Sequence, residues 1–261
     1  MISDLPPQDR AKQRAAERAV AFIEDGMRVG LGTGSTAALM VRALADRIKA
    51  ENLSITAVPT STRTAVLAGE LGIDVITLDE AGWLDLTIDG ADEFDGDLNL
   101  IKGGGGALLQ EKIVAAASDR MIVIADGSKE VETLGVFPLP VEVIRFGWQT
   151  SKRLIGEILE AMEVNGRDIT LRMAGDAPFE TDEGNYILDL HLGRIGRPGR
   201  LALALNQVPG VVENGLFMDI CDVVIVGDAD GHVELRDLNS GERRREGPEP
   251  ETPDNLFSDN Q

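Results

Sequence analysis

The chain has 261 residues, enough for a complete hydrophobic core and for one or two domains. A composition of 43% hydrophobic but only 4% aromatic residues favours an α/β enzyme over a β-sandwich or a stacking nucleic-acid binder, and the net charge of -20 makes nucleic acid and anionic membranes poor partners. No apolar run approaches the ~18 residues of a membrane span, the charged start of the chain has no signal-peptide core, and the single cysteine, Cys221, excludes an internal disulfide. We therefore expect a cytoplasmic protein.

Helix-like and strand-like segments alternate in the first half of the chain. Helical periodicity is expected at 10–23, 37–49, 62–71 and 107–117, and short apolar strands at 27–31, 54–59, 74–78, 86–88 and 121–125. This alternation predicts an α/β fold with a doubly wound, mostly parallel sheet. In such a sheet, ligands bind at the C-terminal ends of the strands.

The pattern changes near residue 139. The expected order is now strand 141–146, helix 151–162, strand 169–173, strand 186–192, helix 199–207 and strand 211–217. This βαββαβ order predicts a second, smaller ferredoxin-like α+β domain over residues 139–218. Strands at 223–226 and 233–235 would return to the first sheet, so a Rossmann-like catalytic domain comprises residues 1–138 and 219–238. Residues 239–261, with arginines at 243–245, have too little apolar content for a core and are predicted to form a disordered acidic tail.

The first expected strand runs into a loop rich in glycine and hydroxyl groups, Gly-Thr-Gly-Ser-Thr at 32–36, which opens a helix. Its amides and hydroxyls could hold a phosphate. The loop also half-matches a dinucleotide fingerprint, which would need an acidic residue about 20 positions on. The second strand instead runs into Val-Pro-Thr-Ser-Thr at 58–62, so phosphate is favoured over NAD.

Two carboxylates, Asp89 and Asp92, follow the expected strand 86–88. Metal ligation, acid-base work with hydroxyl binding, and an acidic turn are all open for this pair. Only two histidines, His191 and His232, occur in the chain, so a required metal is disfavoured, and we expect the carboxylates to bind sugar hydroxyls and move protons. The aspartates at 95 and 97 are typical turn formers.

Four adjacent glycines at 103–106 follow Lys102 and open the helix 107–117. Glycine loses the most conformational freedom on folding, so such a run indicates that the backbone approaches a ligand. The amides lie where a helix N-terminus attracts anions, and Glu111 follows within the helix. A carboxylate near a lysine and a row of amides suits proton transfer with oxyanion stabilisation. Lys129, in Ala-Asp-Gly-Ser-Lys at 125–129, offers another cation to the same edge, although a surface turn is the alternative.

Lysine is rare in this chain. Only six of the 25 basic residues are lysine, and three of the six, Lys102, Lys112 and Lys129, lie between positions 102 and 129. A composition that otherwise prefers arginine keeps a lysine where a compact ammonium is needed beside an oxyanion or phosphate. The strong negative charge would repel a phosphorylated substrate at long range unless salt shortens the Debye length to about 3 Å, as it does near 1 M. The charge and the composition together favour the cytosol of a halophile.

Five ordered motifs carry a resemblance to a known family. They are Gly-Thr-Gly-Ser-Thr at 32–36, Asp-Gly-Ala-Asp-Glu at 89–93, Lys-Gly-Gly-Gly-Gly-Ala at 102–107 with Glu-Lys at 111–112, Ala-Asp-Gly-Ser-Lys at 125–129, and Phe-Pro-Leu-Pro-Val-Glu-Val at 137–143. The chain from about residue 20 to residue 226 resembles type A ribose-5-phosphate isomerases. Two departures are Gln110, where many members carry a basic residue, and the acidic tail after residue 238.

The resemblance implies interconversion of D-ribose 5-phosphate and D-ribulose 5-phosphate through an enediolate, in the non-oxidative pentose phosphate pathway. It implies Glu111 as catalytic base, supported by Asp89 and Lys102, with no cofactor and no metal. The implied substrate-binding residues are Thr33, Gly34, Ser35, Thr36, Asp89, Gly90, Ala91, Asp92, Lys102, Gly103, Gly104, Gly105 and Lys129. We also expect a homodimer or homotetramer, because the sheet of the second domain would be exposed.

Two alternatives remain. A related sugar-phosphate enzyme on the same fold, such as an aminosugar-phosphate deaminase or a phosphogluconolactone hydrolase, would be expected to place histidine in the site, and no histidine lies near these motifs. A non-catalytic sugar-phosphate sensor would keep the phosphate loop without needing Glu111.

Overall fold

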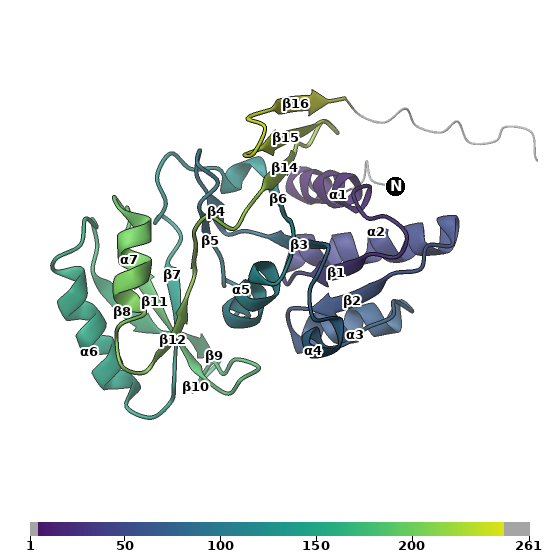
Figure 1. Ribbon diagram of the computed structural model, residues 1–261. Helices are drawn as coiled ribbons and strands as arrows, with labels where there is room; N and C mark the ends of the chain where they lie inside the picture. The colour runs from purple at the N-terminus through teal and green to yellow at the C-terminus, as the bar shows by residue number, and fades with distance from the viewer. Residues whose placement is uncertain (1–4, 248–261) are drawn as a thin grey trace, which may run out of the picture.

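Two sheets of different size organise the molecule, which is described by a computed structural model over residues 5–247. In Figure 1 the larger sheet lies on the right together with α1 and α2, and the smaller one lies on the left, beyond α5. The larger sheet has the order β16-β15-β14-β6-β3-β1-β2. The five strands from β2 to β14 pair in parallel, and β15 and β16 add an antiparallel edge. Its strands are β1 (Arg28–Leu31), β2 (Thr56–Pro59), β3 (Leu86–Gly90), β6 (Met121–Asp126), β14 (Val223–Gly227), β15 (Val233–Asp237) and β16 (Arg243–Glu246).

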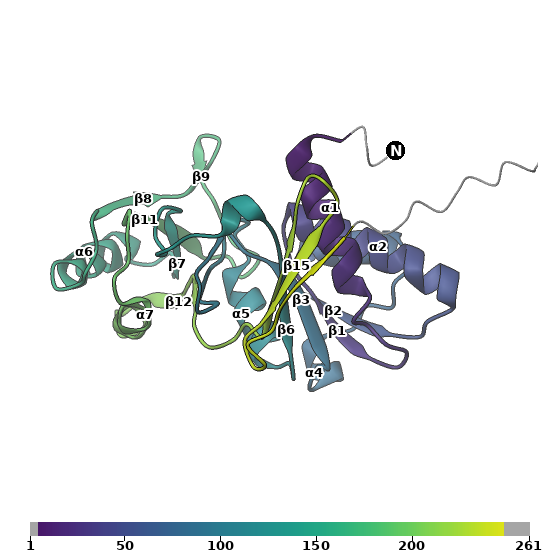
Figure 2. The same cartoon turned by 90° about the horizontal axis from the view of Figure 1, so that it is seen from above.

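Helices cover both faces of this sheet, as the predicted doubly wound fold requires. Figure 2 shows α1 and α2 on one side and α5 on the other. Strand β6 is apolar at nearly every position, and successive side chains point to opposite faces. Ile122 and Ile124 accordingly pack with α1, α2 and α3, whereas Met121 and Val123 pack on the side of α5. The helices are α1 (Pro7–Val20), α2 (Ser35–Glu51), α3 (Thr62–Glu70), α4 (Leu78–Ala81) and α5 (Leu108–Ala116), followed after β6 by the 3-10 helix η2 (Gly127–Lys129).

The second region is a four-stranded antiparallel sheet in the order β12-β7-β11-β8. Helices α6 and α7 share one hydrophobic core with it. The chain order strand, helix, two strands, helix, strand confirms the predicted ferredoxin-like unit. The elements are β7 (Leu139–Val143), α6 (Trp148–Leu159), β8 (Asp168–Leu171), β11 (Tyr186–His191), α7 (Pro198–Leu205) and β12 (Val211–Asn214), with a hairpin of β9 (Met173–Ala174) and β10 (Ala177–Pro178) between β8 and β11. The boundaries drawn between the two domains stay predictions.

The strand predicted at 74–78 is wrong. Only Val75 forms an isolated bridge, to Ala57, and the short helix α4 begins at Leu78. The cause is a capping box, in which the Thr77 hydroxyl accepts from the Glu80 N–H while the Glu80 carboxylate accepts from the Thr77 N–H.

The strand predicted at 211–217 is interrupted at Gly215. Beyond it, β13 (Leu216–Phe217) leaves the second sheet and pairs with β5 (Leu100–Ile101), which pairs with β4 (Glu93–Phe94) in a three-stranded sheet. A Cβ on Gly215 would lie 2.3 Å from the carbonyl oxygen of Lys102, so only glycine fits. The second region is thereby held directly against the segment that carries Lys102.

The prediction of disorder from residue 239 onward is wrong for part of that segment. Strand β16 pairs antiparallel with β15, and Glu246 forms an ion pair with Arg18 of α1 at 2.6 Å. The arginines at 243–245 belong to this exposed edge strand. Pairing with β15 supplies the backbone hydrogen bonds that the composition gave no reason to expect. The rest of the predicted tail, 248–261, lies outside the described residues.

Candidate active site

A cleft lies at the C-terminal ends of β1 and β3, where the strand order of the large sheet reverses. The chain leaves β1 toward α2 on one face and β3 toward α5 on the other, and such a switch point is where open α/β sheets bind ligands. The cleft has a volume of about 110 Å³. It is lined by Lys12, Thr33, Gly34, Ser35, Thr36, Ala37, Gly90, Ala91, Asp92, Lys102, Gly103, Gly104, Gly105, Glu111 and Lys129.

The ammonium of Lys102 lies at the bottom of the cleft and is 2% exposed. Its Nζ lies 2.9 Å from Oδ2 of Asp89 and 3.4 Å from Oε1 of Glu111, and it donates to the carbonyl oxygen of Gly90. Burial opposes the charged form of Lys102, but the two carboxylates outweigh it and raise its pKa above the ordinary lysine value. Lys102 therefore provides a permanent positive charge.

Asp89 lies behind Lys102 and is fully buried, so it supports the cleft without lining it. Its Oδ1 accepts the backbone N–H groups of Thr33, at 3.1 Å, and Gly90, at 2.7 Å. Burial raises the pKa of Asp89, and Lys102 and the two N–H donors act against that rise. The carboxylate thus fixes the position of the ammonium and joins the loops after β1 and β3.

Glu111 has fewer hydrogen-bond donors around it than Asp89, which accepts two backbone N–H groups. It lies in the first turn of α5 and is 3% exposed, and its Oε2 has no hydrogen-bond partner among residues 5–247. Burial raises the pKa of Glu111 to about 8, against the attraction of Lys102 and with the repulsion of Asp89 and Asp92. A buried carboxyl with a free oxygen and a pKa near neutrality suits a general base.

The glycine loop (103–106) takes its shape from its surroundings. The Gly106 N–H closes a turn onto the Gly103 carbonyl at 3.0 Å, and the Gly104 N–H donates to Oδ2 of Asp92 at 2.7 Å. A Cβ on Gly104 would lie 2.5 Å from Oδ1 of Asp92, and one on Gly106, whose φ is 81°, would lie 2.4 Å from the ring of Phe179. These positions admit no side chain.

Two residues of the second region hold this loop, Arg172 and Phe179. The Arg172 guanidinium donates to the carbonyls of Gly103 and Gly104 and forms a two-point ion pair with Asp189. Neither contact could be predicted from the sequence, because the partners are about 70 residues apart along the chain.

The phosphate loop (34–36) forms the opposite wall. Gly34 is the N-cap of the 17-residue helix α2, with a φ of 121°, and Ser35 and Thr36 occupy the first turn. The amides there attract anions because helix dipoles concentrate positive potential at this end. Lys129 of η2 and Lys12 of α1 line the same end, and the Lys12 ammonium donates to the Ser35 hydroxyl at 3.4 Å. Lys12 was not among the residues nominated from the sequence, although the scarcity of lysine could have singled it out.

Thr33 faces two ways. The residue lines the cleft, but its hydroxyl lies in a buried cluster with the hydroxyls of Thr60 and Ser61, each at 2.8 Å, and Thr64 at 3.2 Å. These hydroxyls follow β2 and begin α3, so they tie the loop after β1 to the neighbouring strand. The Thr33 hydroxyl is therefore a support for the loop, not a free ligand group.

The structure brings together every residue that the sequence nominated, with Asp89 in the layer behind the lining. Gln110, by contrast, donates to Glu183 and does not line the cleft. The described residues contain no group of three or more His, Cys, Asp and Glu side chains placed to hold a metal. Asp95 accepts the N–H groups of Asp97 and Asn99, as expected of a turn former.

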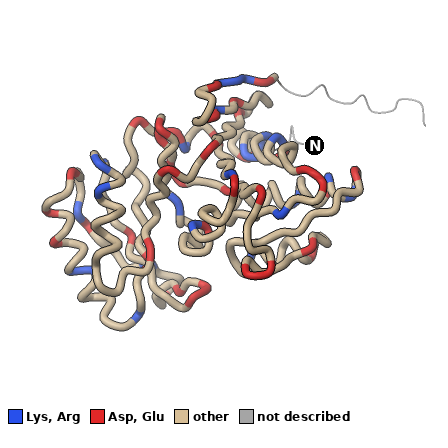
Figure 3. The backbone as a smooth tube through the Cα atoms, in the orientation of Figure 1, with Lys and Arg blue, Asp and Glu red and all other residues tan. Residues whose placement is uncertain are grey.

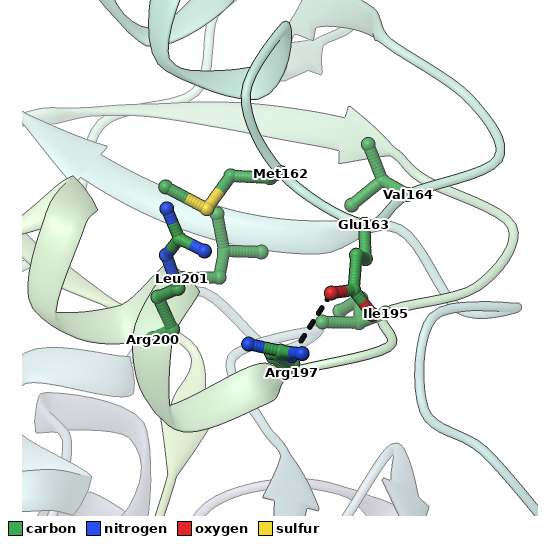
Figure 4. Close-up of a pocket in the computed structure, with 7 residues that line it drawn as sticks. All are labelled: Met162, Glu163, Val164, Ile195, Arg197, Arg200 and Leu201. Carbon is green, nitrogen blue, oxygen red and sulfur yellow. Dashed lines mark ion pairs between the residues drawn. The ribbon is translucent and has the colours of Figure 1, made fainter.

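Another cleft, on the second region, is too small for a ligand. It lies between Met162, Glu163 and Arg197, and Figure 4 shows the Glu163–Arg197 ion pair, 2.9 Å long, across it. Its volume of about 10 Å³ is close to the minimum for a single water.

Comparisons with known proteins agree with this geometry. The family model for ribose 5-phosphate isomerase A (phosphoriboisomerase A) matches residues 56–231. Ribose-5-phosphate isomerase A of Ruegeria pomeroyi is 67% identical, and that of Ruegeria sp. is 66% identical, each over 99% of both chains.

Solved structures of ribose 5-phosphate isomerases are similar to this chain over most of its length. A D-ribose-5-phosphate isomerase in complex with phospho-erythronic acid is 41% identical, with a TM-score of 0.82 over 89% of this chain and 100% of its own. Ribose 5-phosphate isomerase A from Methanocaldococcus jannaschii is also 41% identical, with a TM-score of 0.79 over 87% of this chain and 97% of its own.

Proposed function

The chain belongs to the ribose 5-phosphate isomerase A family and interconverts ribose 5-phosphate and ribulose 5-phosphate, and from this premise we propose how the cleft performs the reaction. The observation that carries the proposal is the free, buried Oε2 of Glu111 beside a buried ammonium. The reaction moves one proton between C2 and C1 of the open-chain sugar. A single carboxylate between the two carbons suffices for both transfers.

Glu111 removes the C2 proton and returns it to C1. Its pKa of about 8 makes it a stronger base than an exposed carboxylate while leaving a usable ionised fraction near neutral pH. Ionised Glu111 takes up the C2 proton, and the C1 carbonyl oxygen of the sugar gains negative charge as the enediolate forms. The hydroxyl proton then moves from the C2 oxygen to the C1 oxygen, so that return of the proton from Glu111 to C1 leaves a hydroxyl at C1 and the ketone at C2.

The Lys102 ammonium and the Gly105 N–H stabilise this enediolate oxygen. Lys102 is already oriented by Asp89, so it need not reorganise during the reaction. The Gly105 N–H has no partner among the described residues and lies in the cleft wall. Asp92, held by the Gly104 N–H, orients the sugar hydroxyls, and Asp89 assists ring opening by way of Lys102.

The phosphate lies at the other end of the cleft, against Gly34, Ser35 and Thr36, with Lys129 and Lys12 beside it. It is remote from the reacting carbons, so its contacts supply binding energy and place the sugar. Phospho-erythronic acid, which a solved relative contains, pairs a phosphate with a carboxylate. In this cleft the carboxylate would take the place of the enediolate oxygens.

The test is conversion of ribose 5-phosphate by the protein in concentrated KCl with EDTA, alongside Glu111→Gln. We expect metal-free conversion by the wild-type protein. The variant should lose about 10³-fold or more in kcat while its affinity for phospho-erythronic acid stays within a few-fold, because the phosphate contacts are intact. Retained turnover would contradict the assignment of Glu111, and EDTA-sensitive turnover would return Asp89 and Asp92 to metal ligation.

We further propose that the protein works at high salt, in the cytoplasm, as a homodimer or homotetramer. The net charge of -20 supports the salt requirement, and Figure 3 shows Asp and Glu positions along the backbone of both regions. No described helix is long and apolar enough to cross a membrane. A charged sugar phosphate does not cross a bilayer unaided, which favours a cell interior as the site of action. The exposed side chains of Phe146, Val136 and Leu203 support self-association. Sedimentation and thermal unfolding across a KCl series test these points.

A further inference from the structure

We propose that Arg172, held by Asp189, is a positioning residue that sets the glycine loop so that the Gly105 N–H faces the enediolate. The inference rests on the proposed function of the cleft and adds the second region of the molecule to the catalytic apparatus. It concerns a residue that lies outside the cleft lining and about 70 positions from the loop in sequence.

The guanidinium of Arg172 divides its donors between two partners. Nε and Nη2 donate to the two carboxylate oxygens of Asp189, at 2.9 and 2.5 Å, and Nη1 donates to the carbonyls of Gly103 and Gly104, at 2.8 and 3.1 Å. The ion pair is largely buried, with 15% of the Arg172 side chain and 17% of the Asp189 side chain exposed. A planar guanidinium held at one edge by a carboxylate has its remaining donors fixed in direction.

Fixing the two carbonyls also fixes the two N–H groups that follow them. In a trans peptide the C=O and the next N–H point in opposite directions. With the Gly103 carbonyl turned toward Arg172, the Gly104 N–H points away and meets Asp92 at 2.7 Å. With the Gly104 carbonyl turned the same way, the Gly105 N–H also points away from Arg172, and Gly105 lines the cleft.

The loop cannot keep this orientation through its own conformational preference. Glycine populates left- and right-handed backbone conformations about equally, so four in a row leave the peptide planes free to rotate. The turn hydrogen bond from Gly106 to Gly103 closes the loop ends but does not touch the Gly104–Gly105 peptide. Phe179, which packs against Gly106, holds the far end, and the Arg172 guanidinium carbon lies 6.0 Å from the centre of its ring.

The experiment compares Arg172→Met, which keeps an unbranched apolar stem, although a shorter one, and has no donor, with Arg172→Lys. A lysine can bond a carbonyl or the carboxylate but cannot reproduce the divided contact. The matched control is Arg145→Met, because Arg145 also forms an arginine–carboxylate pair in the second region, with Glu180 at 2.8 Å, but makes no contact with the loop. Each variant is assayed for kcat and KM, for thermal unfolding, and for inhibition by two phosphates: phospho-erythronic acid, whose carboxylate imitates the enediolate charge, and ribitol 5-phosphate, which has no charge at C1 or C2.

We expect Arg172→Met to lower kcat by about 10- to 100-fold, less than the 10²- to 10³-fold typical of deleting an oxyanion donor, because the N–H is misdirected and not removed. KM should change by less than about threefold, inhibition by phospho-erythronic acid should weaken in parallel with kcat, and inhibition by ribitol 5-phosphate should stay the same. Arg172→Lys should fall between this variant and wild type, and Arg145→Met should match wild type. If Arg172→Met does not fold, the same selective pattern in Arg172→Lys decides the matter.

A kcat within twofold of wild type in the folded variants would overturn the inference, and so would equal weakening of both inhibitors, which would indicate a general loss of cleft structure. Failure of the proposed function itself looks different, since it would show as retained turnover in Glu111→Gln whatever the Arg172 variants do.

Discussion

The two loops that form the walls of the cleft are built in different ways, although both precede a helix. A Cβ on Gly34 of the phosphate loop would meet no atom within 4 Å, so this loop is open to its ligand. In the glycine loop, a Cβ on Gly103, Gly104 or Gly106 would lie within 2.8 Å of Leu108, Asp92 or Phe179 respectively. The phosphate loop offers the general anion site of a helix N-terminus, whereas the glycine loop is moulded by distant residues to suit one reaction.

The contrast extends to the charges beside each loop. Lys12 and Lys129 stand at the phosphate end and are partly exposed. At the glycine loop, one ammonium, Lys102, is buried with Asp89 and Glu111. Changes at the phosphate end should therefore weaken binding, and changes at the glycine loop should slow the chemistry.

Among changes to the two loops, the largest expected effect is that of Gly106→Ala. The added methyl would overlap the Phe179 ring and hold alanine at a φ of 81°, so the loop must move. We expect kcat to fall about 100-fold or more and the protein to be destabilised by about 2–3 kcal/mol. Gly105→Ala is the stability control, because its Cβ would lie no closer than 3.5 Å to any atom, and its melting temperature should match wild type. Normal activity and stability in Gly106→Ala would show that the glycine loop tolerates a side chain, as the open phosphate loop does, and would contradict the contrast.

Glu111→Gln should stabilise the protein, most strongly at alkaline pH. The folded protein raises the pKa of Glu111 from 4.5 to about 8, so between these values the folded state binds more protons than the unfolded state and loses stability as pH rises. Glutamine does not titrate. The difference in unfolding free energy between variant and wild type should therefore grow from near zero around pH 4 to as much as about 4 kcal/mol at pH 8. Denaturant titrations at several pH values measure this difference in unfolding free energy. A difference that does not change with pH would show that burial does not raise the pKa of Glu111.

The pH profile of kcat/KM should follow the ionisation of Glu111, which lies on the glycine-loop side of the cleft. Glu111 must be ionised to accept the C2 proton, so activity should rise as pH increases through about 8. Between pH 6 and pH 8 the ionised fraction grows about 50-fold, and kcat/KM should follow it. Lys129→Met should keep the same profile at a lower level. A kcat/KM that stays constant between pH 6 and pH 8 would show that the catalytic base is not the buried carboxyl of Glu111.

The smallest effect is expected at the phosphate end. Lys129→Met removes one cation from a site that keeps the α2 amides and Lys12, so KM should rise about 5- to 10-fold while kcat stays within about twofold. The increase should shrink in high salt, because exposed charges are screened. A fall in kcat with unchanged KM would place Lys129 in the chemistry instead.

The two loops also differ in how much of their structure could be predicted from the sequence. The phosphate loop was predictable because a strand, a glycine turn and a helix are adjacent in sequence. The nominated residues of the glycine loop were visible too, since four adjacent glycines next to a lysine are costly unless the backbone approaches a ligand.

The residues that orient the glycine loop were not visible. Arg172 and Phe179 approach it only after the ferredoxin-like unit has packed against α5, and no local pattern marks an arginine whose carbonyl partners are so distant in sequence. The β16 pairing was missed for a similar reason, because the hydrogen bonds of an edge strand depend on a neighbour and not on hydrophobic periodicity.

The most direct test of Glu111 as the proton carrier is to follow the reaction in D₂O by NMR. With wild-type protein, a carboxyl that carries the proton exchanges it with solvent, so deuterium should appear at C1 of ribulose 5-phosphate. Glu111→Gln should incorporate none while still binding phospho-erythronic acid. Deuterium incorporation by the variant at the wild-type rate would contradict the account.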